Sequence, residues 1–181
     1  MKQYLKLRRL TNSVEINEVR RGSVVVGIGG YAIDKSPTKI ATWALGSCVA
    51  IIFYDPYTST GTLAHSLLPR PLRGVDLPTK YVSTAIPYLL RKFKALGIPP
   101  RRLQSALIGG ANILQLDNGP NIGRSNVDKA RLLLKKLSIP IVAIDVGGTS
   151  GRNVVLDLST GTVYVWYTRS TFTAFSHRFK R

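Results

Sequence analysis

The first half of the chain alternates short apolar, β-branched runs with glycines and turn residues, a pattern typical of strands. Runs of this kind occupy residues 24–29, 40–45 and 49–54. The third run ends at Asp55-Pro56 and is followed by turn residues as far as Gly61. We therefore expect residues 62–68 to return as the hairpin partner of the third strand.

Beyond Thr79 the spacing of apolar residues changes to that of a helix. One row of this helix face consists of Tyr81, Ala85, Leu89 and Phe93. Thr79 is a suitable N-cap, and Gly97 and Pro99 end the run. Pro87 lies inside the segment, where it would kink the helix or mark a break. The spacing predicts an amphipathic helix between Thr79 and Gly97.

The remaining segments predict more strands and one more helix. Strands are expected at 104–108 and 139–146, a helix at 126–137, and a final hairpin formed by 154–158 and 163–167. Because helices cluster in the middle and hairpins dominate both ends, the order favours a mixed α/β fold. Its sheets would be layered with helices on one side, rather than forming an alternating parallel fold.

The chain has 181 residues, the length of one ordinary domain that can bury a core without disulfides or metal. We expect that domain over residues 22–168. It would lie between a charged, irregular basic arm at 1–21 and a basic C-terminal tail at 169–181. His177 lies in this tail, where we expect an exposed and non-catalytic side chain.

The sequence predicts a cytoplasmic protein. Its single cysteine, Cys48, excludes an intrachain disulfide and a multi-cysteine zinc site, which fits a reducing compartment. No apolar run approaches the roughly 18–20 residues of a membrane span, and the N-terminus has no long apolar stretch of the secretory kind.

Charge is the most unusual bulk property, since 26 basic residues against 9 acidic ones give a net charge of +17. Such an excess attracts acidic partners, which include nucleic acid, anionic lipid and carboxylate-rich protein surfaces. No nucleic-acid recognition motif accompanies it, so charge-driven nucleic-acid binding is an alternative without a sequence-reading element. A solvated helix face is the simpler explanation for Lys92, Lys94, Arg131, Lys135 and Lys136.

The candidate chemistry centres on Cys48 and on His65, seventeen residues further along the chain. A thiol needs a nearby base to become a nucleophile at neutral pH, and imidazole has a suitable pKa. Gly46 and Ser47 before the cysteine provide a small, turn-capable backbone with N–H groups near the sulfur. The structural alternative is that Cys48 is a small buried hydrophobe. Strand register in the hairpin decides whether the two side chains meet.

Several blocks of the sequence then point to one family. They are Ala44-Leu45-Gly46-Ser47-Cys48-Val49, Tyr54-Asp55-Pro56, Gly61-Thr62-Leu63-Ala64-His65-Ser66-Leu67-Leu68-Pro69, Lys80-Tyr81, Ile108-Gly109-Gly110-Ala111 and Asp145-Val146-Gly147-Gly148-Thr149-Ser150-Gly151-Arg152. In this order the chain resembles the chemoreceptor glutamine deamidase family CheD, from about Val24 to Val165. The most specific element is Gly-Ser-Cys-Val followed by Ala-His.

The resemblance implies a fold and a reaction. The fold is a single-domain, three-layer α/β/β sandwich related to the catalytic domain of cytotoxic necrotising factor. The reaction is deamidation of glutamines on methyl-accepting chemotaxis receptors, with no metal or organic cofactor. Cys48 corresponds to the nucleophile, His65 to the base and Thr42 to the residue that orients the histidine. Backbone N–H groups around Gly46 and Ser47 would stabilise the oxyanion.

The resemblance leaves two points open. Many members of the family bind the phosphatase CheC, so an alternative function is a non-catalytic docking module for a CheC-like phosphatase or a receptor. The pairs Gly109-Gly110 and Gly147-Gly148 would either flank the site and admit a glutamine side chain or simply end strands tightly. Asp145, an acid in an apolar strand, is expected to satisfy backbone groups or Arg152 rather than to take part in catalysis.

Overall fold

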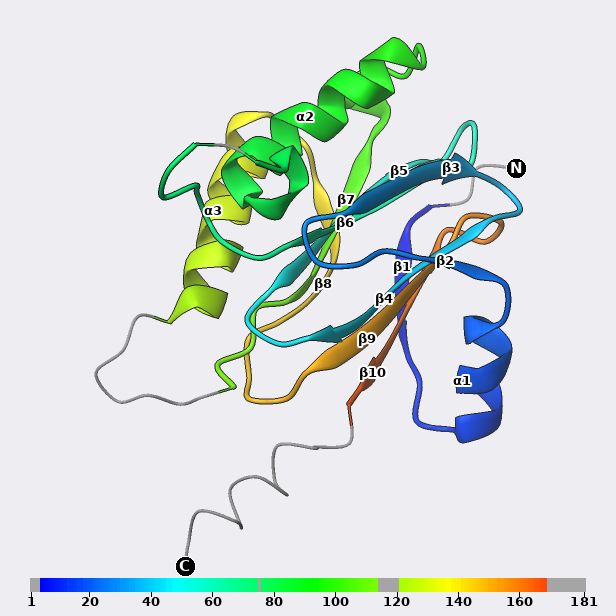
Figure 1. The fold of residues 1–181 in the computed structure, drawn as a ribbon. Helices are drawn as coiled ribbons and strands as arrows, with labels where there is room; N and C mark the ends of the chain where they lie inside the picture. Colours follow the sequence, from blue (N-terminus) through cyan, green and yellow to red (C-terminus); the bar gives the residue numbers. More distant parts are fainter. Residues whose placement is uncertain (1–3, 75, 114–120, 169–181) are drawn as a thin grey trace, which may run out of the picture.

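Two stacked five-stranded sheets form the body of the protein, in a computed structural model that describes residues 4–74, 76–113 and 121–168 (Figure 1). Sheet A has the order β1 (Lys6–Arg9), β10 (Thr162–Tyr167), β9 (Arg152–Asp157), β4 (Lys39–Leu45), β2 (Ser23–Val25). Sheet B has the order β3 (Tyr31–Lys35), β6 (Thr60–Ser66), β5 (Val49–Asp55), β7 (Gln104–Gly109), β8 (Ile141–Val146).

Three helices complete the described chain, and two of them cover the outer face of sheet B (Figure 1). The helices are α1 (Ser13–Arg20), α2 (Val82–Ala95) and α3 (Ile122–Lys136), with short 3-10 turns at Pro78–Lys80 and Pro100–Arg102. Helices α2 and α3 pack on sheet B, and sheet B packs on sheet A, so the predicted α/β/β sandwich is confirmed. No helix among the described residues is long and apolar enough to cross a membrane.

Strand β5 lies at the centre of the molecule and is buried on both faces. Ala50, Ile52 and Tyr54 belong to the core between the two sheets. The alternate side chains, which include Val49 and Phe53, belong to the core beneath the helices. Burial on both faces explains why this strand is a continuous apolar run rather than an alternating one.

The N-terminal segment differs from the expected irregular arm, because residues 6–20 form β1 and α1 on sheet A. Strand β1 pairs in parallel with β10. Helix α1 packs Ile16 and Val19 into a small cluster with Trp43 and Trp166 on the outer face of sheet A. Helices therefore lie on both outer sides of the sandwich, rather than on one. The charged residues of this segment face solvent at a sheet edge, where a short strand needs no sustained apolar period.

Other boundaries also shift. Strand β3 lies between two predicted strands and was not predicted, because it is an edge strand without a buried residue. Helix α2 begins at Val82, since Thr79 lies in a 3-10 turn and donates its hydroxyl to the carbonyl oxygen of Gly29 instead of capping the helix. Helix α2 continues through Pro87 without a break. Helix α3 begins four residues earlier than predicted, capped by Asn121.

A glycine in β6 tests the packing between the sheets. A Cβ on Gly61 would lie 2.5 Å from Cδ2 of Leu158, whereas a Cβ on Gly27 would meet nothing within 4 Å. We expect Gly61→Ala to lower the free energy of unfolding by about 1–3 kcal/mol through overpacking. Gly27→Ala should change it by less than about 0.5 kcal/mol. Urea unfolding of both variants checks this expectation, and equal losses would contradict it.

Candidate active site

A hydrogen bond between Thr42 and His65 crosses the interface between the two sheets. Thr42 lies on β4 of sheet A and His65 on β6 of sheet B, and both side chains are buried. Oγ1 of Thr42 lies 2.8 Å from Nδ1 of His65. The same hydroxyl donates to the carbonyl oxygen of Val26 at 2.8 Å. Since a hydroxyl has one proton, the proton between Thr42 and His65 must come from Nδ1.

This arrangement leaves Nε2 of His65 with a free lone pair whenever the imidazole is neutral. Nε2 is buried and has no hydrogen-bond partner among the described residues. Burial also lowers the pKa of His65 to about 4, because the apolar surroundings disfavour the charged ring. At neutral pH the site therefore holds an uncharged imidazole with an unused proton acceptor.

The register of the β5–β6 hairpin places Cys48 on the same face as His65. Ala50 pairs directly with His65, and Cys48 precedes Ala50 by two residues. Successive residues of a strand point to opposite faces, so side chains two apart share one. Consistent with this placement, Cys48 belongs with Ala50 to the core between the sheets. The thiol and the imidazole are thus diagonal neighbours at one end of sheet B, without a hydrogen bond between them.

The thiol of Cys48 is uncharged at rest. The side chain is 7% exposed, and burial raises the pKa of Cys48 above its ordinary value. Burial therefore favours the neutral form of both partners, a thiol and an imidazole.

Close backbone packing holds the segment that carries the cysteine. The carbonyl oxygen of Cys48 accepts a hydrogen bond from the N–H of Gly110 at 2.7 Å, and that of Gly46 accepts one from Ala111 at 2.8 Å. Gly109 has φ of 111°, and a Cβ there would lie 2.4 Å from the carbonyl oxygen of Cys48. A side chain at Gly109 would therefore displace the cysteine.

The turn before β5 also provides possible donors for an anion. Within the described residues, the backbone N–H groups of Ser47 and Cys48 donate to no other residue. Two such groups beside a sulfur can donate to a negatively charged oxygen that develops on a substrate.

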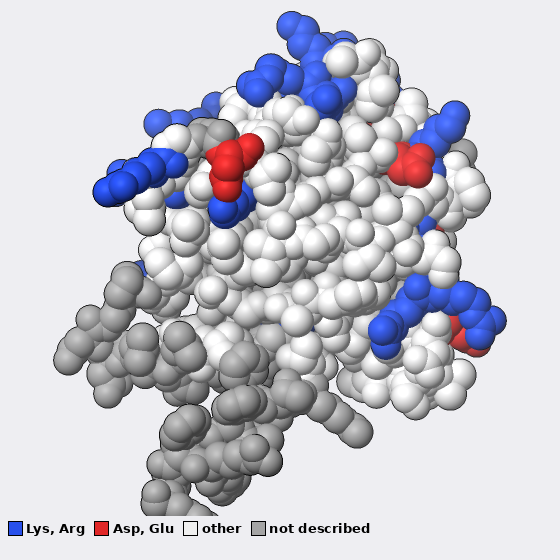
Figure 2. Space-filling view, in the orientation of Figure 1, with Lys and Arg blue, Asp and Glu red and all other residues white. Residues whose placement is uncertain are grey.

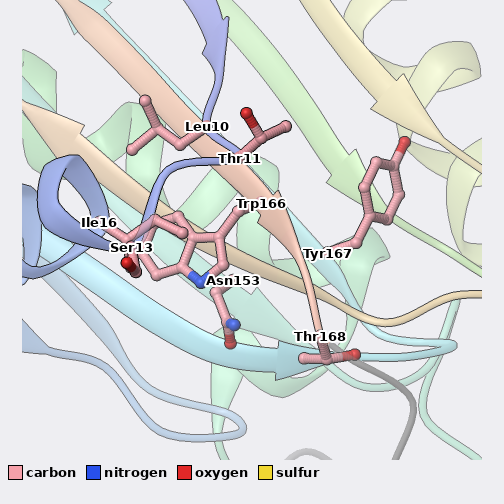
Figure 3. A pocket seen from close by; sticks show the side chains of 8 residues that line it. All are labelled: Leu10, Thr11, Ser13, Ile16, Asn153, Trp166, Tyr167 and Thr168. Atoms are coloured by element: carbon pink, nitrogen blue, oxygen red, sulfur yellow. The ribbon is translucent and has the colours of Figure 1, made fainter.

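Three of the other glycines singled out in the sequence line a cavity beside α3. Gly110, Gly147 and Gly148 line a cavity of about 340 Å³, together with Arg124 and Arg131. Neither Cys48 nor His65 lines this cavity. A larger cavity of about 560 Å³ lies beside α1 and the ends of β9 and β10, and contains none of the predicted site residues (Figure 3).

Asp145 has the structural role expected from the sequence. Its carboxylate accepts hydrogen bonds from Arg152 at 2.9 Å and from Arg9 at 2.9 Å, and both Asp145 and Arg152 are buried. Arg9 on β1 and Arg152 on β9 thus join sheet A to Asp145 on β8, an edge strand of sheet B.

One further residue, Asn126, touches this site and was not predicted to do so. Asn126 on α3 is fully buried, and its amide donates to the carbonyl oxygens of Ser47 and Leu67. A polar residue near a helix end carries no sequence signal for contacts 79 and 59 residues away. His177 lies outside the described residues.

Comparison with known proteins identifies the family of this chain. A family model described as "CheD chemotactic sensory transduction" matches residues 67–167. "Probable chemoreceptor glutamine deamidase CheD" of Thermococcus kodakarensis is 44% identical over 144 residues, 77% of this chain and 89% of the relative. "Chemoreceptor glutamine deamidase CheD" of Thermotoga maritima is 39% identical over 141 residues, 78% of this chain and 89% of the relative.

A solved structure, Neisseria meningitidis protein NMB0706, matches with 16% sequence identity and a TM-score of 0.38, covering 81% of this chain and 64% of that one. The fold and site define an α/β/β sandwich protein with a cysteine and a threonine-bound histidine on one face of a sheet. Within that class, the chain belongs to the CheD family.

The low pKa of His65 predicts a pH dependence of stability. Unfolded histidine titrates near 6.5 and folded His65 near 4, so the native state binds fewer protons between these values. The contribution of the neutral ring is fully present above about pH 6.5 and is lost as the pH falls to about 4. We expect this to cost about 3 kcal/mol of unfolding free energy. Urea unfolding from pH 7 to pH 4 measures it, and a His65→Asn variant with the same pH profile would contradict it.

Thr42 provides a second test. Thr42→Val keeps the shape but removes the hydroxyl, which leaves Nδ1–H of His65 and the carbonyl oxygen of Val26 buried without partners. We expect a loss of about 1–3 kcal/mol in the free energy of unfolding. Thr42→Ser, which keeps the hydroxyl, should retain the hydrogen bonds and lose less. Thermal and urea unfolding compare the two variants, and a larger loss in Thr42→Ser would contradict this account.

Proposed function

We propose that this protein is a protein-glutamine deamidase that converts glutamines of methyl-accepting chemotaxis receptors to glutamates. One observation carries the proposal: the unpaired Nε2 of His65 and the thiol of Cys48 share one face at the end of the same hairpin. The names of the relatives from Thermococcus kodakarensis and Thermotoga maritima, both of which specify chemoreceptor glutamine deamidation, support the substrate.

In the first half of the reaction, the sulfur of Cys48 attacks the carboxamide carbon of a receptor glutamine. Nε2 of His65 accepts the thiol proton during the attack, because burial keeps both groups neutral until then. The N–H groups of Ser47 and Cys48 donate to the oxyanion. The imidazolium then transfers this proton to the amide nitrogen as the carbon–nitrogen bond breaks. Ammonia leaves, and a thioester remains on Cys48.

In the second half, His65 takes a proton from water as the water oxygen attacks the thioester carbon. The carbon–sulfur bond breaks, the proton returns to the sulfur, and glutamate and the free thiol are released. The hydroxyl oxygen of Thr42 accepts a hydrogen bond from Nδ1–H throughout, and so holds the ring in the tautomer that leaves Nε2 as the base. Nε2 of His65 makes no hydrogen bond to the sulfur, and catalytic hydrogen bonds commonly tighten only when substrate binds.

The substrate and partners follow from the surface and the resemblance. Lys and Arg side chains gather around the margins of one face, while its centre is largely uncharged (Figure 2). A net charge of +17 would speed encounter with carboxylate-rich receptor helices in the cytoplasm. We propose that Gly109-Gly110 and Gly147-Gly148 shape the approach of the glutamine side chain. We also propose a CheC-like phosphatase as a partner, on the basis of the family resemblance alone.

The decisive experiment incubates a purified receptor cytoplasmic fragment with the protein and maps glutamine-to-glutamate conversion by peptide mass spectrometry. We expect conversion with wild type and none with Cys48→Ala. His65→Ala should lose at least about 100-fold in turnover, the usual contribution of a general base. The other histidine provides a matched control, since His177→Ala should retain turnover.

Each outcome separates the candidate functions. Conversion by Cys48→Ala would refute the nucleophile. Receptor binding without conversion by wild type would favour the docking-module alternative. Salt-sensitive retention of DNA without conversion would favour charge-driven nucleic-acid binding.

A further inference from the structure

We infer that Asn126 is a positioning residue of this site, whose side-chain amide joins the segment entering Cys48 to the segment leaving His65. The inference rests on the proposed function and adds to it a residue from the helical layer. Asn126 touches neither the sulfur nor the imidazole through its hydrogen bonds, so it acts through the two segments that it holds.

The contacts of the amide are specific. Nδ2 of Asn126 donates to the carbonyl oxygen of Ser47 at 2.9 Å and to that of Leu67 at 3.0 Å. Ser47 immediately precedes Cys48, and Leu67 follows His65 by two residues. The two hydrogens of one amide group thus bind the segment just before β5 and the segment just after β6, from a residue that is fully buried.

The backbone ladder does not perform this task at that end of the hairpin. The pairing of β5 with β6 ends at Val49 and Ser66. Beyond it the N–H of Leu67 turns away and donates to the carbonyl oxygen of Lys80 at 2.8 Å. The bridge made by Asn126 therefore takes the place of the next rung of the ladder, next to the reacting side chains.

The orientation of the amide is fixed by its surroundings. Oδ1 of Asn126 is buried and has no hydrogen-bond partner among the described residues. Turning the amide over would place Oδ1 against two carbonyl oxygens and remove both hydrogen bonds. A buried acceptor without a partner costs free energy. The orientation seen here is still the favoured one, because it keeps the two hydrogen bonds that Nδ2 donates.

The functional consequence is control of the distance between sulfur and Nε2. A displacement of about 1 Å in a catalytic group can cost about 100-fold in rate. Without this bridge the carbonyl groups of Ser47 and Leu67 are no longer held together. Because these two segments carry the nucleophile and the base, the distance between sulfur and Nε2 is then no longer fixed. Turnover is therefore expected to fall more than substrate binding.

The first test is Asn126→Asp, which keeps size and shape but replaces the donor with a second acceptor. We expect kcat on the receptor fragment to fall about 10–100-fold, with KM changed less than about threefold. The loss should grow as the pH rises, because an ionised carboxylate repels both carbonyl oxygens and a protonated one can still donate once. An unchanged kcat in the folded variant would overturn the inference.

Ser105→Ala is the matched control, since it also removes a buried hydrogen bond from a side chain to a carbonyl oxygen. Oγ of Ser105 donates to the carbonyl oxygen of Pro140 at 2.8 Å, and Ser105 pairs with Phe53, far along β5 from Cys48. We expect its kcat to stay within about twofold of wild type at a similar loss of stability.

The second test is a double-mutant cycle that needs no receptor. Alkylation of Cys48 by iodoacetamide is timed in wild type, Asn126→Asp, His65→Asn and the double variant. If Asn126 acts by placing the imidazole, Asn126→Asp slows alkylation about tenfold when His65 is present. In the His65→Asn background the same substitution slows it less than about twofold. Equal factors in both backgrounds would show a purely structural effect and overturn the inference. If Asn126→Asp does not fold, Asn126→Ala carries the same cycle.

Receptor conversion tests the proposed function, and coupling in the alkylation cycle tests the positioning role of Asn126. Coupling in the alkylation cycle without receptor conversion by wild type would refute the proposed function and leave the positioning role standing. Receptor conversion with additive effects in the cycle would refute the positioning role alone.

Discussion

The hydrogen bond from Nδ1 of His65 to Thr42 is the contact on which the site depends. An imidazole is polar, and burying it between two apolar sheets is costly unless its donor is satisfied. Thr42 meets this need from the opposite sheet only because its own proton goes to the carbonyl oxygen of Val26. The stacking of the sheets therefore determines which nitrogen of His65 is left as a base.

Each layer of the sandwich contributes a different part of this arrangement. Sheet A supplies Thr42, sheet B supplies the cysteine and the histidine, and the helical layer supplies Asn126. The closeness of β7 to the cysteine segment depends on Gly109, where any side chain would collide with the carbonyl oxygen of Cys48. The site is thus a product of the packing between layers rather than of one loop.

The net positive charge of the chain is separate from the uncharged pair of Cys48 and His65. The thiol of Cys48 and the imidazole of His65 are both uncharged at rest, since burial shifts the pKa of the thiol up and that of the imidazole down. The buried acids Asp55 and Asp145 are paired with Arg102 and Arg152. The large positive excess is consequently placed to influence encounter with an acidic partner more than the reaction itself.

The sequence by itself determined the strongly periodic elements, among them β5 and α2, because burial of a face imposes its period on the residues. It also predicted Cys48 and His65 as candidate site residues, through their spacing and the resemblance to a family. Only the tertiary structure decided the tautomer of His65 and the role of Asn126, since both depend on carbonyl groups supplied by other strands. Short edge elements such as β1 and β3 escaped prediction for a related reason: what stabilises them is a neighbouring strand, and no local pattern records which strand that will be.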